Sequence, residues 1–502
     1  MHRVLRWLVA ASAALFSLTA CTGDARMHGA GDGGADAPLS DSPFDGQPAT
    51  DGATLGNDGS DPDPVFSADE WAALQALSPT RLPDPPPDPT NRLADDPAAA
   101  RLGQRLFFDP GFSGQLLSTD NDGSAQALGR ANATSGDTGR VACAACHVPA
   151  GGFSDTRSFQ RQVSLGAGWG ARRAPSLLDV GQARLIMWDG RRDSLFSQVF
   201  GPLESVAEMN SSRLYMAQQL YQRYRAEYES VFGPMPLLDD TSRFPSLAAN
   251  VTGCIPQNRT EPAPVCNGPF HGMPGDHAEF DRMTEIDQQA ITTVVVNAGK
   301  ALGAYQRLLS CGLGPFDDWM HGGQQAISRA AQRGAAIFVG RGGCVTCHSG
   351  PFMSDQRFHN VGLVPAVVQQ FILDAHDRGA AVGIASLITD PLNSSGAFSD
   401  GTDTRLPFPG AVTSAMEGAF RTPMLRCVNM RPSWMHTGQL QSLEAVVAFF
   451  NRGGDAPGGG YPGMSELHAL GLSPRDQGDL TAFLRTLDGP GAPTELRSPP
   501  AM

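Results

Sequence analysis

Apolar residues recur every three or four positions along two long segments of this chain. In residues 211–232 the stripe consists of Leu214, Ala217, Tyr221, Tyr224, Tyr228 and Phe232. In residues 285–310 it consists of Ile291, Val294, Val295, Ala298, Leu302, Tyr305 and Leu309. Such spacing places the apolar side chains on one face of an amphipathic helix. We therefore expect two long helices, with the tyrosines packed in the interior rather than serving as a radical path.

Shorter segments also have helical character. They are residues 67–77, 102–108, 323–339, 441–451 and 473–487. Ser473 stands at an N-cap position and Pro474 follows it, which is a typical helix start. Strand patterns are scarce, and the stretches 117–139, 236–280 and 349–440 are rich in residues that favour loops. The pattern predicts an all-α fold in two domains, with long loops.

The N-terminus has the pattern of an export signal. Arg3 and Arg6 precede an apolar run that ends in Leu18-Thr19-Ala20-Cys21. This ending resembles the lipobox of bacterial lipoproteins, which implies a signal peptide over 1–21 and lipidation of Cys21; an ordinary signal peptide with an incidental cysteine is the alternative. By a family-level rule, Thr22 after the cysteine favours the outer membrane. No other apolar run approaches the ~18 residues of a transmembrane helix.

Composition limits the possible partners. Residues 22–66 are rich in Gly, Asp, Ser and Pro and poor in large apolar residues, so we expect a disordered acidic tether. A tethered body behind a lipid anchor indicates a periplasmic protein held at a membrane. The net charge of −14 argues against nucleic acid binding, and an acidic body suits a basic partner such as a small cytochrome c.

Two Cys-x-x-Cys-His motifs carry the candidate chemistry. They are Cys143-Ala144-Ala145-Cys146-His147 and Cys344-Val345-Thr346-Cys347-His348. In such a motif the two thiols form thioethers with one haem and the histidine is an axial iron ligand. A zinc site would need four ligands, and a thioredoxin-like pair would need a βαβ context. Neither is evident, so we predict two covalently bound c-type haems.

The remaining cysteines suggest disulfides. Of nine cysteines, Cys21 and the four motif residues leave Cys254, Cys266, Cys311 and Cys427. An even number in an oxidising compartment favours two bridges, with three possible connectivities. Cys254 and Cys266 share one loop and are natural partners, which would leave Cys311 to pair with Cys427.

Beyond the two motifs, the chain resembles the bacterial di-haem cytochrome c peroxidases and the related enzyme MauG over roughly residues 98–490. The matching segments, in the order of the family, include LGQRLFFDPGFS, CAACHVPAGGFSD, RRAPSLL, MWDGR, GPLESVAEMN, CVTCHSGPFMSD, FRTPMLR and WMHTGQLQSLEAVVAFFNRGG. The resemblance implies an N-terminal peroxide-reacting haem domain over 67–315, a C-terminal electron-transfer haem domain over 316–490 and a tail over 491–502.

The resemblance also implies roles for particular residues. His147 would ligate the first haem and His348 the second. Glu208 would be the distal acid/base that moves a proton between the two peroxide oxygens, and Gln198 would be its distal neighbour. Trp188 would couple the two haems. Taken alone, Glu208 could be a charge at a helix N-terminus, and Trp188 a large core side chain.

The chain departs from the family at three places. Where many relatives have a histidine that caps the first haem, this chain has Ala167 in Gly166-Ala167-Gly168-Trp169, which implies an open first haem as in MauG. The sixth ligand of the second haem, a Met or Tyr fourteen residues after His436, is replaced by Phe450. Nearby thioethers that could replace it are Met416, Met424, Met430 and Met435.

The third departure concerns calcium. The family often binds this ion through an Asn at the position of Arg173, and Arg431 falls near another ligand position. Because a cationic side chain is no calcium ligand, we expect no calcium there. The sequence thus predicts a periplasmic di-haem oxidoreductase that uses hydrogen peroxide, taking electrons from a small c-type cytochrome or oxidising a protein or small molecule. The alternative is a di-haem electron carrier without peroxidase activity.

Overall fold

The structure is a computed structural model, and its described part is helical. The described residues are 64–118, 121, 133–157, 163–253, 270–365, 376–403, 411–455 and 461–501, with the backbone of 367–368 and 371–372. The predicted signal peptide, Cys21, nearly all of the 22–66 segment, Cys254 and Cys266 lie outside these residues.

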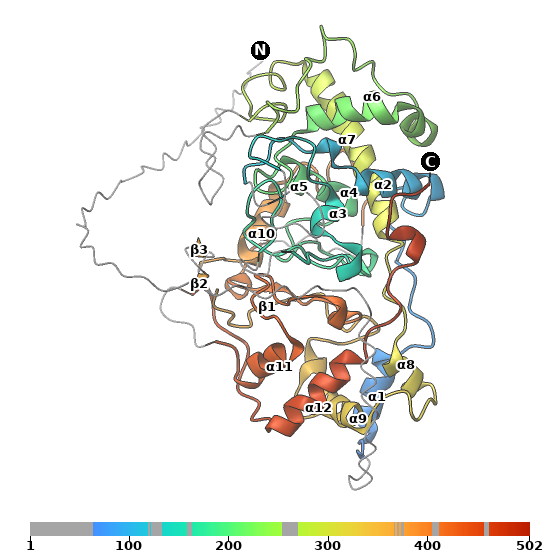
Figure 1. The fold of residues 1–502 in the computed structure, drawn as a ribbon, viewed down its shortest axis with the longest axis vertical. Coiled ribbons are helices and arrows are strands. Elements are labelled where there is room, and N and C mark those ends of the chain that lie inside the picture. The colour runs from blue at the N-terminus through green and yellow to red at the C-terminus, as the bar shows by residue number, and fades with distance from the viewer. Residues whose placement is uncertain are drawn as a thin grey trace, which may run out of the picture. The chain divides into compact units, whose positions relative to one another are not determined.

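Helices account for most of the regular structure (Figure 1). They are α1 (Ala68–Leu77), α2 (Pro97–Phe108), α3 (Cys143–Cys146), α4 (Leu195–Gln198), α5 (Phe200–Glu204), α6 (Arg213–Phe232), α7 (Glu285–Gln306), α8 (Pro315–Met320), α9 (Arg329–Val339), α10 (Ala380–Thr389), α11 (Leu443–Asn451) and α12 (Pro474–Arg485). Two antiparallel two-residue pairs join β1 (Phe358–His359) to β4 (Phe420–Arg421) and β2 (Val367–Val368) to β3 (Phe371–Ile372). The expected scarcity of strands is confirmed for the described residues.

Side-chain caps set several helix starts. Ser67 and Ser473 each accept a hydrogen bond from the backbone three residues on, within capping boxes that open α1 and α12. The predicted start at Ser473 is therefore confirmed. Helix α2 is longer than expected, because Asp96 caps it and Pro97 occupies its first position. Helix α9 is shorter, because its cap is Ser328.

Helix α10 was not predicted, and the assignment of 349–440 as wholly irregular is wrong there. Its N-cap is Gly379, which offers no side-chain hydrogen bond. Its sequence, AAVGIASLIT, carries a glycine and several β-branched residues, which weaken intrinsic helix preference. Tertiary packing stabilises the helix instead: Ala380, Ile384 and Leu387 are buried in a small cluster with Ala419.

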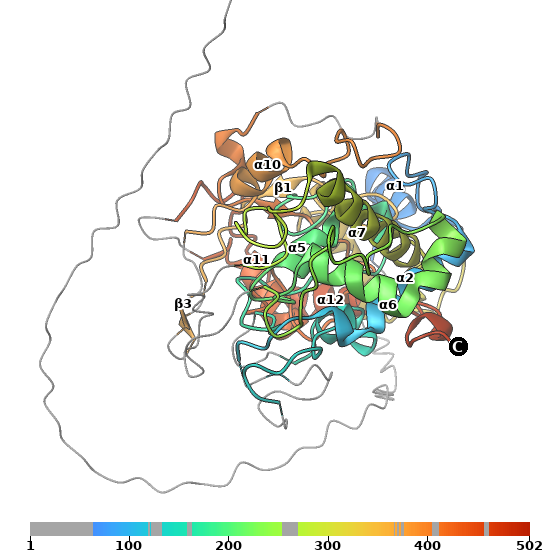
Figure 2. The ribbon, with the colours of Figure 1, turned by 90° about the horizontal axis from the view of Figure 1, so that it is seen from above.

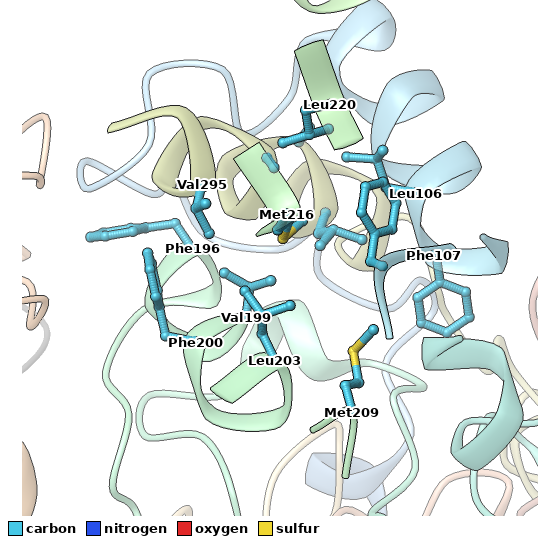
Figure 3. Packing of buried hydrophobic residues seen from close by; sticks show 14 of the residues in the cluster. Leu106, Phe107, Phe196, Val199, Phe200, Leu203, Met209, Met216, Leu220 and Val295 are labelled. Carbon is cyan, nitrogen blue, oxygen red and sulfur yellow. The ribbon is translucent and has the colours of Figure 1, made fainter. Parts of the chain in front are cut away.

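The larger hydrophobic core joins α2, α4, α5, α6 and α7. Figure 3 shows Leu106, Phe196, Phe200, Leu220 and Val295 from these helices packed in one interior. On the α6 stripe, Leu214, Ala217, Tyr224 and Tyr228 are buried, while Tyr221 and Phe232 are partly buried. The predicted apolar faces of the two long helices are thus confirmed as core.

A second core joins α9, α11 and α12. It includes Phe338, Val447 and Phe483, and also Leu74 and Leu77 from α1. Helix α1 therefore packs with segments from the other end of the chain, beside α9 and α12 in Figure 1. Seen from above in Figure 2, α7 and α6 of the first core lie over α12 of the second.

Two links connect the C-terminal half of the chain to the first core. A disulfide joins Cys311, just after α7, to Cys427, and this confirms the predicted partnership of these two cysteines. Near the C-terminus, the Tyr305 hydroxyl donates a hydrogen bond to the Leu496 carbonyl, 2.6 Å away. The segment predicted as a tail thus begins with residues bound to α7.

The second half of the structure repeats features of the first, as the two Cys-x-x-Cys-His motifs in the sequence indicate. Helix α2 crosses α7 at Gly103, where a Cβ would lie 1.9 Å from the Ala301 carbonyl oxygen. Helix α9 crosses α12 at Gly334, where a Cβ would lie 2.0 Å from the Asp479 carbonyl oxygen. In both halves, a glycine in a helix that precedes the Cys-x-x-Cys-His motif allows two helix backbones to touch.

The loops after each motif repeat as well. Met187 and Met435 both have φ of 70°, and each precedes an aromatic residue, Trp188 in one half and His436 in the other. The two halves meet through reciprocal backbone hydrogen bonds. Arg173 N donates to His436 O (2.7 Å), and Arg421 N donates to Trp188 O (2.8 Å). Such exchange between equivalent positions is the pattern of a two-fold related interface.

Candidate active site

Each Cys-x-x-Cys-His motif lies on a single tight turn. Cys143 and Cys146 bound helix α3, and Cys344 opens a 3₁₀ turn that continues to Cys347. All four cysteines are free thiols. Burial raises the pKa of Cys143, Cys146 and Cys344 to about 12, so these sulfur atoms are protonated and ready for a covalent partner rather than exposed as thiolates.

The two motif histidines are oriented alike. His147 Nδ1 lies 3.1 Å from the Phe153 carbonyl oxygen, and His348 Nδ1 lies 2.9 Å from the Met353 carbonyl oxygen. A carbonyl only accepts, so Nδ1 carries the proton and Nε2 keeps its lone pair for a metal. Burial lowers the pKa of both imidazoles, which also favours the neutral, ligating form.

The Ala167 loop lies directly against the segment that carries Glu208. Ala167 N donates to Glu208 O (2.6 Å) and Gly168 N donates to Ala207 O (3.0 Å). A Cβ on Gly166 would lie 2.3 Å from Glu208 O, so only glycine permits this approach. The loop that carries a capping histidine in relatives is thus held beside Glu208, with a fully buried methyl group at its tip.

The Glu208 carboxyl lies within electrostatic range of the first motif. Its negative charge contributes to raising the pKa of both Cys143 and Cys146, so the three side chains share one electrostatic environment. Burial raises the pKa of Glu208 itself, while Arg191 and a hydrogen bond from Ser205 lower it in part. A carboxyl group with a raised pKa in a buried site is suited to accept and return a proton.

Gln198 and Trp188 lie on neighbouring segments. Gln198 ends α4, and its Nε2 lies 4.0 Å from the Met187 sulfur, next to Trp188 in the chain. Trp188 Nε1 donates to Arg173 O (2.7 Å), and its ring lies edge-on to His436 with 6.4 Å between centroids. Trp188 therefore lies where the two halves meet.

Arg421 and Arg431 are half-buried arginines whose surroundings bear on whether this region can bind a haem. Burial lowers the pKa of Arg421 and Arg431 to about 10, and the carboxylates of Asp488 and Asp179 offset this only in part, and only for Arg431. Arg431 Nε is buried without a hydrogen-bond partner among the described residues. A buried cation is costly unless an anion pairs with it. The two propionates of a haem are anions of the required kind, so these residues fit the group; the sequence pattern singles out only Arg431, and only for calcium.

Arginine side chains occupy the positions expected for calcium ligands. The Arg173 guanidinium donates to the Asp155 carbonyl, and Arg431 Nη2 donates to the Met424 carbonyl at 2.7 Å. Both side chains direct positive charge at backbone oxygens, which is the role that a bound cation would otherwise have.

Packing places Phe450 and two of the four candidate methionines. Phe450 lies on α11 with its ring edge-on to Phe449, 5.4 Å between centroids. Of the four candidate methionines, Met430 directs its sulfur at Gly491, and Met416 packs on the small cluster around α10. These two thioethers are therefore packing groups.

Comparison with known proteins agrees with this arrangement. The model of the di-haem cytochrome c peroxidase family matches residues 97–255. The methylamine utilization protein MauG of Methylorubrum extorquens is 30% identical over 424 residues, covering 84% of this chain and 86% of that protein. The chain belongs to this di-haem peroxidase family.

Other relatives extend the comparison. The cytochrome-c peroxidase IdrP1 of Denitromonas iodatirespirans is 30% identical over 436 residues, covering 84% of this chain and 90% of that protein. The crystal structure of the diheme peroxidase BthA from Burkholderia thailandensis has a TM-score of 0.51 at 20% identity, covering 84% of this chain and 99% of that one. The predicted family is therefore confirmed, and the protein is an oxidoreductase of the di-haem peroxidase type. No described helix combines the length and apolar character needed to cross a membrane.

Proposed function

We propose that this protein is a c-type di-haem oxidoreductase that reacts with hydrogen peroxide at an open N-terminal haem and receives electrons through a C-terminal haem domain. The observation that carries the proposal is the Ala167 loop, which sets a buried methyl group, with no ligating atom, against the backbone of the half-buried Glu208. A haem held by His147 would keep one coordination position free for peroxide.

Separate sets of residues would bind the two haems. Cys143, Cys146 and His147 would hold the first haem, and Cys344, Cys347 and His348 the second. Bound haem supplies an iron that binds peroxide and exchanges electrons. Arg421 and Arg431 would neutralise haem propionates.

Glu208 and its neighbours supply the acid/base chemistry. The Glu208 carboxylate would take the proton from the near peroxide oxygen and return it to the departing one, so that water leaves instead of hydroxide. Gln198, at the end of α4, would orient the bound peroxide by hydrogen bonding. The buried surroundings of Glu208 exclude water and strengthen both interactions.

Two forms of the reaction are open, and the chain's departures favour one of them. Electrons from a small c-type cytochrome or another periplasmic redox protein would make the enzyme a peroxidase. Oxidation of a protein or small molecule would make it similar in action to MauG. Ala167 and Phe450 each stand where the family pattern has a haem ligand. These two departures favour the MauG-like oxidation. The rival function is that of a di-haem electron carrier with both irons capped.

A stopped-flow spectrum separates enzyme from carrier. The purified diferric protein is mixed with one equivalent of hydrogen peroxide. Rapid loss of the high-spin ferric bands, with a new oxidised haem spectrum, supports the enzyme. Slow bleaching without other change means that both irons are capped, and the carrier function would then replace the proposal.

The cellular location is part of the proposal. The lipobox-like ending at Cys21 supports a lipid-anchored periplasmic protein, with the acidic 22–66 segment as its tether and the outer membrane as its site. Mass spectrometry of the mature N-terminus and separation of inner from outer membranes test this. A soluble mature chain cleaved elsewhere would exclude the anchor.

A further inference from the structure

Equivalent positions of the two halves touch each other at one place. Trp188 and His436 occupy the same position of the repeated turn, and their rings meet edge-on with 6.4 Å between centroids. Arg172 and Phe420 precede the equivalent residues Arg173 and Arg421, and the Arg172 guanidinium carbon lies 5.2 Å from the centre of the Phe420 ring. We call these four residues, Arg172, Phe420, His436 and Trp188, the junction stack.

The middle of the junction stack is closely packed. The rings of Phe420 and His436 are stacked, with 3.6 Å between centroids and 17° between planes. Both residues are buried, so the contact is shielded from water. Burial lowers the pKa of His436 to about 3, although Asp377 and Asp189 raise it in part; the imidazole is therefore an uncharged ring at neutral pH. Phe420 limits the orientations open to the imidazole that Trp188 faces.

Arg172 ties this stack to the segments that hold Trp188. Its guanidinium forms a two-point ion pair with Asp377 (2.8 and 2.7 Å) and a third bond to Asp189 (2.6 Å). Asp189 directly follows Trp188 in the chain. Arg173, which follows Arg172, accepts the Trp188 indole N–H on its carbonyl. Arg172 thus belongs to the segment that accepts the indole N–H and, together with Arg191, binds the carboxylate of Asp189 after the indole, and it also covers Phe420.

We propose that Arg172 is a positioning residue for the bridge between the two redox centres: it holds Trp188 edge-on to His436 by fixing Asp189, Asp377 and Phe420 together. The inference rests on the proposed function only in taking the Trp188 region as the route between the haems. An ordinary structural ion pair would stabilise the fold without determining the geometry of Trp188. The two possibilities predict different effects of replacing Arg172.

The experiment uses the intact two-haem protein and compares four variants. Arg172→Met removes the fork, and Arg172→Lys keeps the charge but not the planar group. Phe420→Leu removes the stacked ring and leaves every ion pair. Arg333→Met is the matched control, because Arg333 makes a similar two-point pair with Asp479 (2.7 and 2.9 Å) between α9 and α12.

Two measurements report on Trp188. Ultraviolet resonance Raman spectra, with the Trp188→Phe protein subtracted, give the strength of the indole N–H hydrogen bond. Pulse reduction by one electron, without peroxide, gives the rate at which the two haems equilibrate. Since neither measurement uses peroxide turnover, a failure here is distinct from a failure of the proposed function.

We expect Arg172→Met and Phe420→Leu to slow equilibration by about tenfold or more, because small displacements of a positioned group have large effects on rate. Arg172→Met should also weaken the indole hydrogen bond, and Arg172→Lys should recover part of both losses. Arg333→Met should leave both unchanged. If Arg172→Met folds and behaves like Arg333→Met in both measurements, Arg172 is a structural ion pair and the proposal is wrong. If Arg172→Met does not fold, unchanged rates in Phe420→Leu lead to the same conclusion.

Discussion

At the scale of single residues, burial decides what the ionisable groups of this site can do. Glu208 is half-buried within electrostatic range of the first motif, and its pKa is raised above the ordinary 4.5 because the charged form loses water. Arg421 and Arg431 are buried with lowered pKa values for the same reason. A carboxyl group with a raised pKa and two cations suited to carboxylates together favour a haem site with acid/base chemistry.

Replacing Glu208 tests the acid/base role. Glu208→Gln should lower the rate constant of the peroxide reaction by about 10²–10⁴-fold, the usual contribution of a positioned general acid/base. Glu229→Gln is the control, because Glu229 lies near the protein surface in an ion pair with Arg225. Stopped-flow mixing with peroxide measures both. An unchanged rate in Glu208→Gln would remove Glu208 from the mechanism.

The pH dependence of the same rate depends on the direction of the pKa shift. Glu208 accepts a proton only when ionised, so the rate should rise with pH through the Glu208 pKa, which burial places above its ordinary value of 4.5. The rising limb should therefore lie at higher pH than for an exposed glutamate, and it should be absent in Glu208→Gln. A rate that falls with rising pH over this range would contradict the assignment.

At the scale of elements, two helix crossings position the motifs. Helices α2 and α9, which precede the first and the second Cys-x-x-Cys-His turn, contact α7 and α12 through Gly103 and Gly334. A methyl group at either site would overlap a carbonyl oxygen of the partner helix. The crossings therefore fix where each motif begins relative to its core.

Alanine substitution tests these crossings. Gly103→Ala and Gly334→Ala should each destabilise the protein by about 1–3 kcal/mol through overpacking. Gly478→Ala is a matched control on α12: nothing lies within 4 Å of its added Cβ, and it should stabilise by roughly 0.5–1 kcal/mol. Guanidinium unfolding of the three variants measures this. Equal changes in the free energy of unfolding at all three glycines would mean that the close contacts at Gly103 and Gly334 do not exclude a methyl group.

At the scale of the whole molecule, the two halves are joined by more than their reciprocal hydrogen bonds. The Cys311–Cys427 disulfide links positions 116 residues apart. Cross-linking a loop of this length restricts the unfolded chain strongly. The double variant Cys311→Ala/Cys427→Ala should lose about 2–5 kcal/mol of stability, measured by thermal or denaturant unfolding. Stability equal to that of the parent protein would show that the bridge does not constrain the unfolded state.

Calcium dependence is also a property of the joined halves. Arg173 and Arg431 direct guanidinium groups at the carbonyls of Asp155 and Met424. We expect peroxide reactivity to survive prolonged chelation, because fixed cations stand where relatives use an ion. Activity lost to chelator and restored by added calcium would overturn this expectation.

The sequence by itself determined the chemistry and most helices. Two Cys-x-x-Cys-His motifs, the stripes of 211–232 and 285–310 and the cap at Ser473 are local patterns, and each is set by residues within a few turns of one another. Periodicity and capping residues were therefore sufficient to predict these helices. The predicted pairing of Cys311 with Cys427 came from counting.

Only the tertiary structure decided how the halves meet. Helix α10 has weak intrinsic preference and forms because distant residues bury its face. The contact of Trp188 with His436, the anchoring by Arg172 and the burial of Arg421 and Arg431 join segments from opposite halves of the chain. Burial and long-range contact are properties of the folded chain as a whole, and no local pattern of apolar and polar positions encodes them.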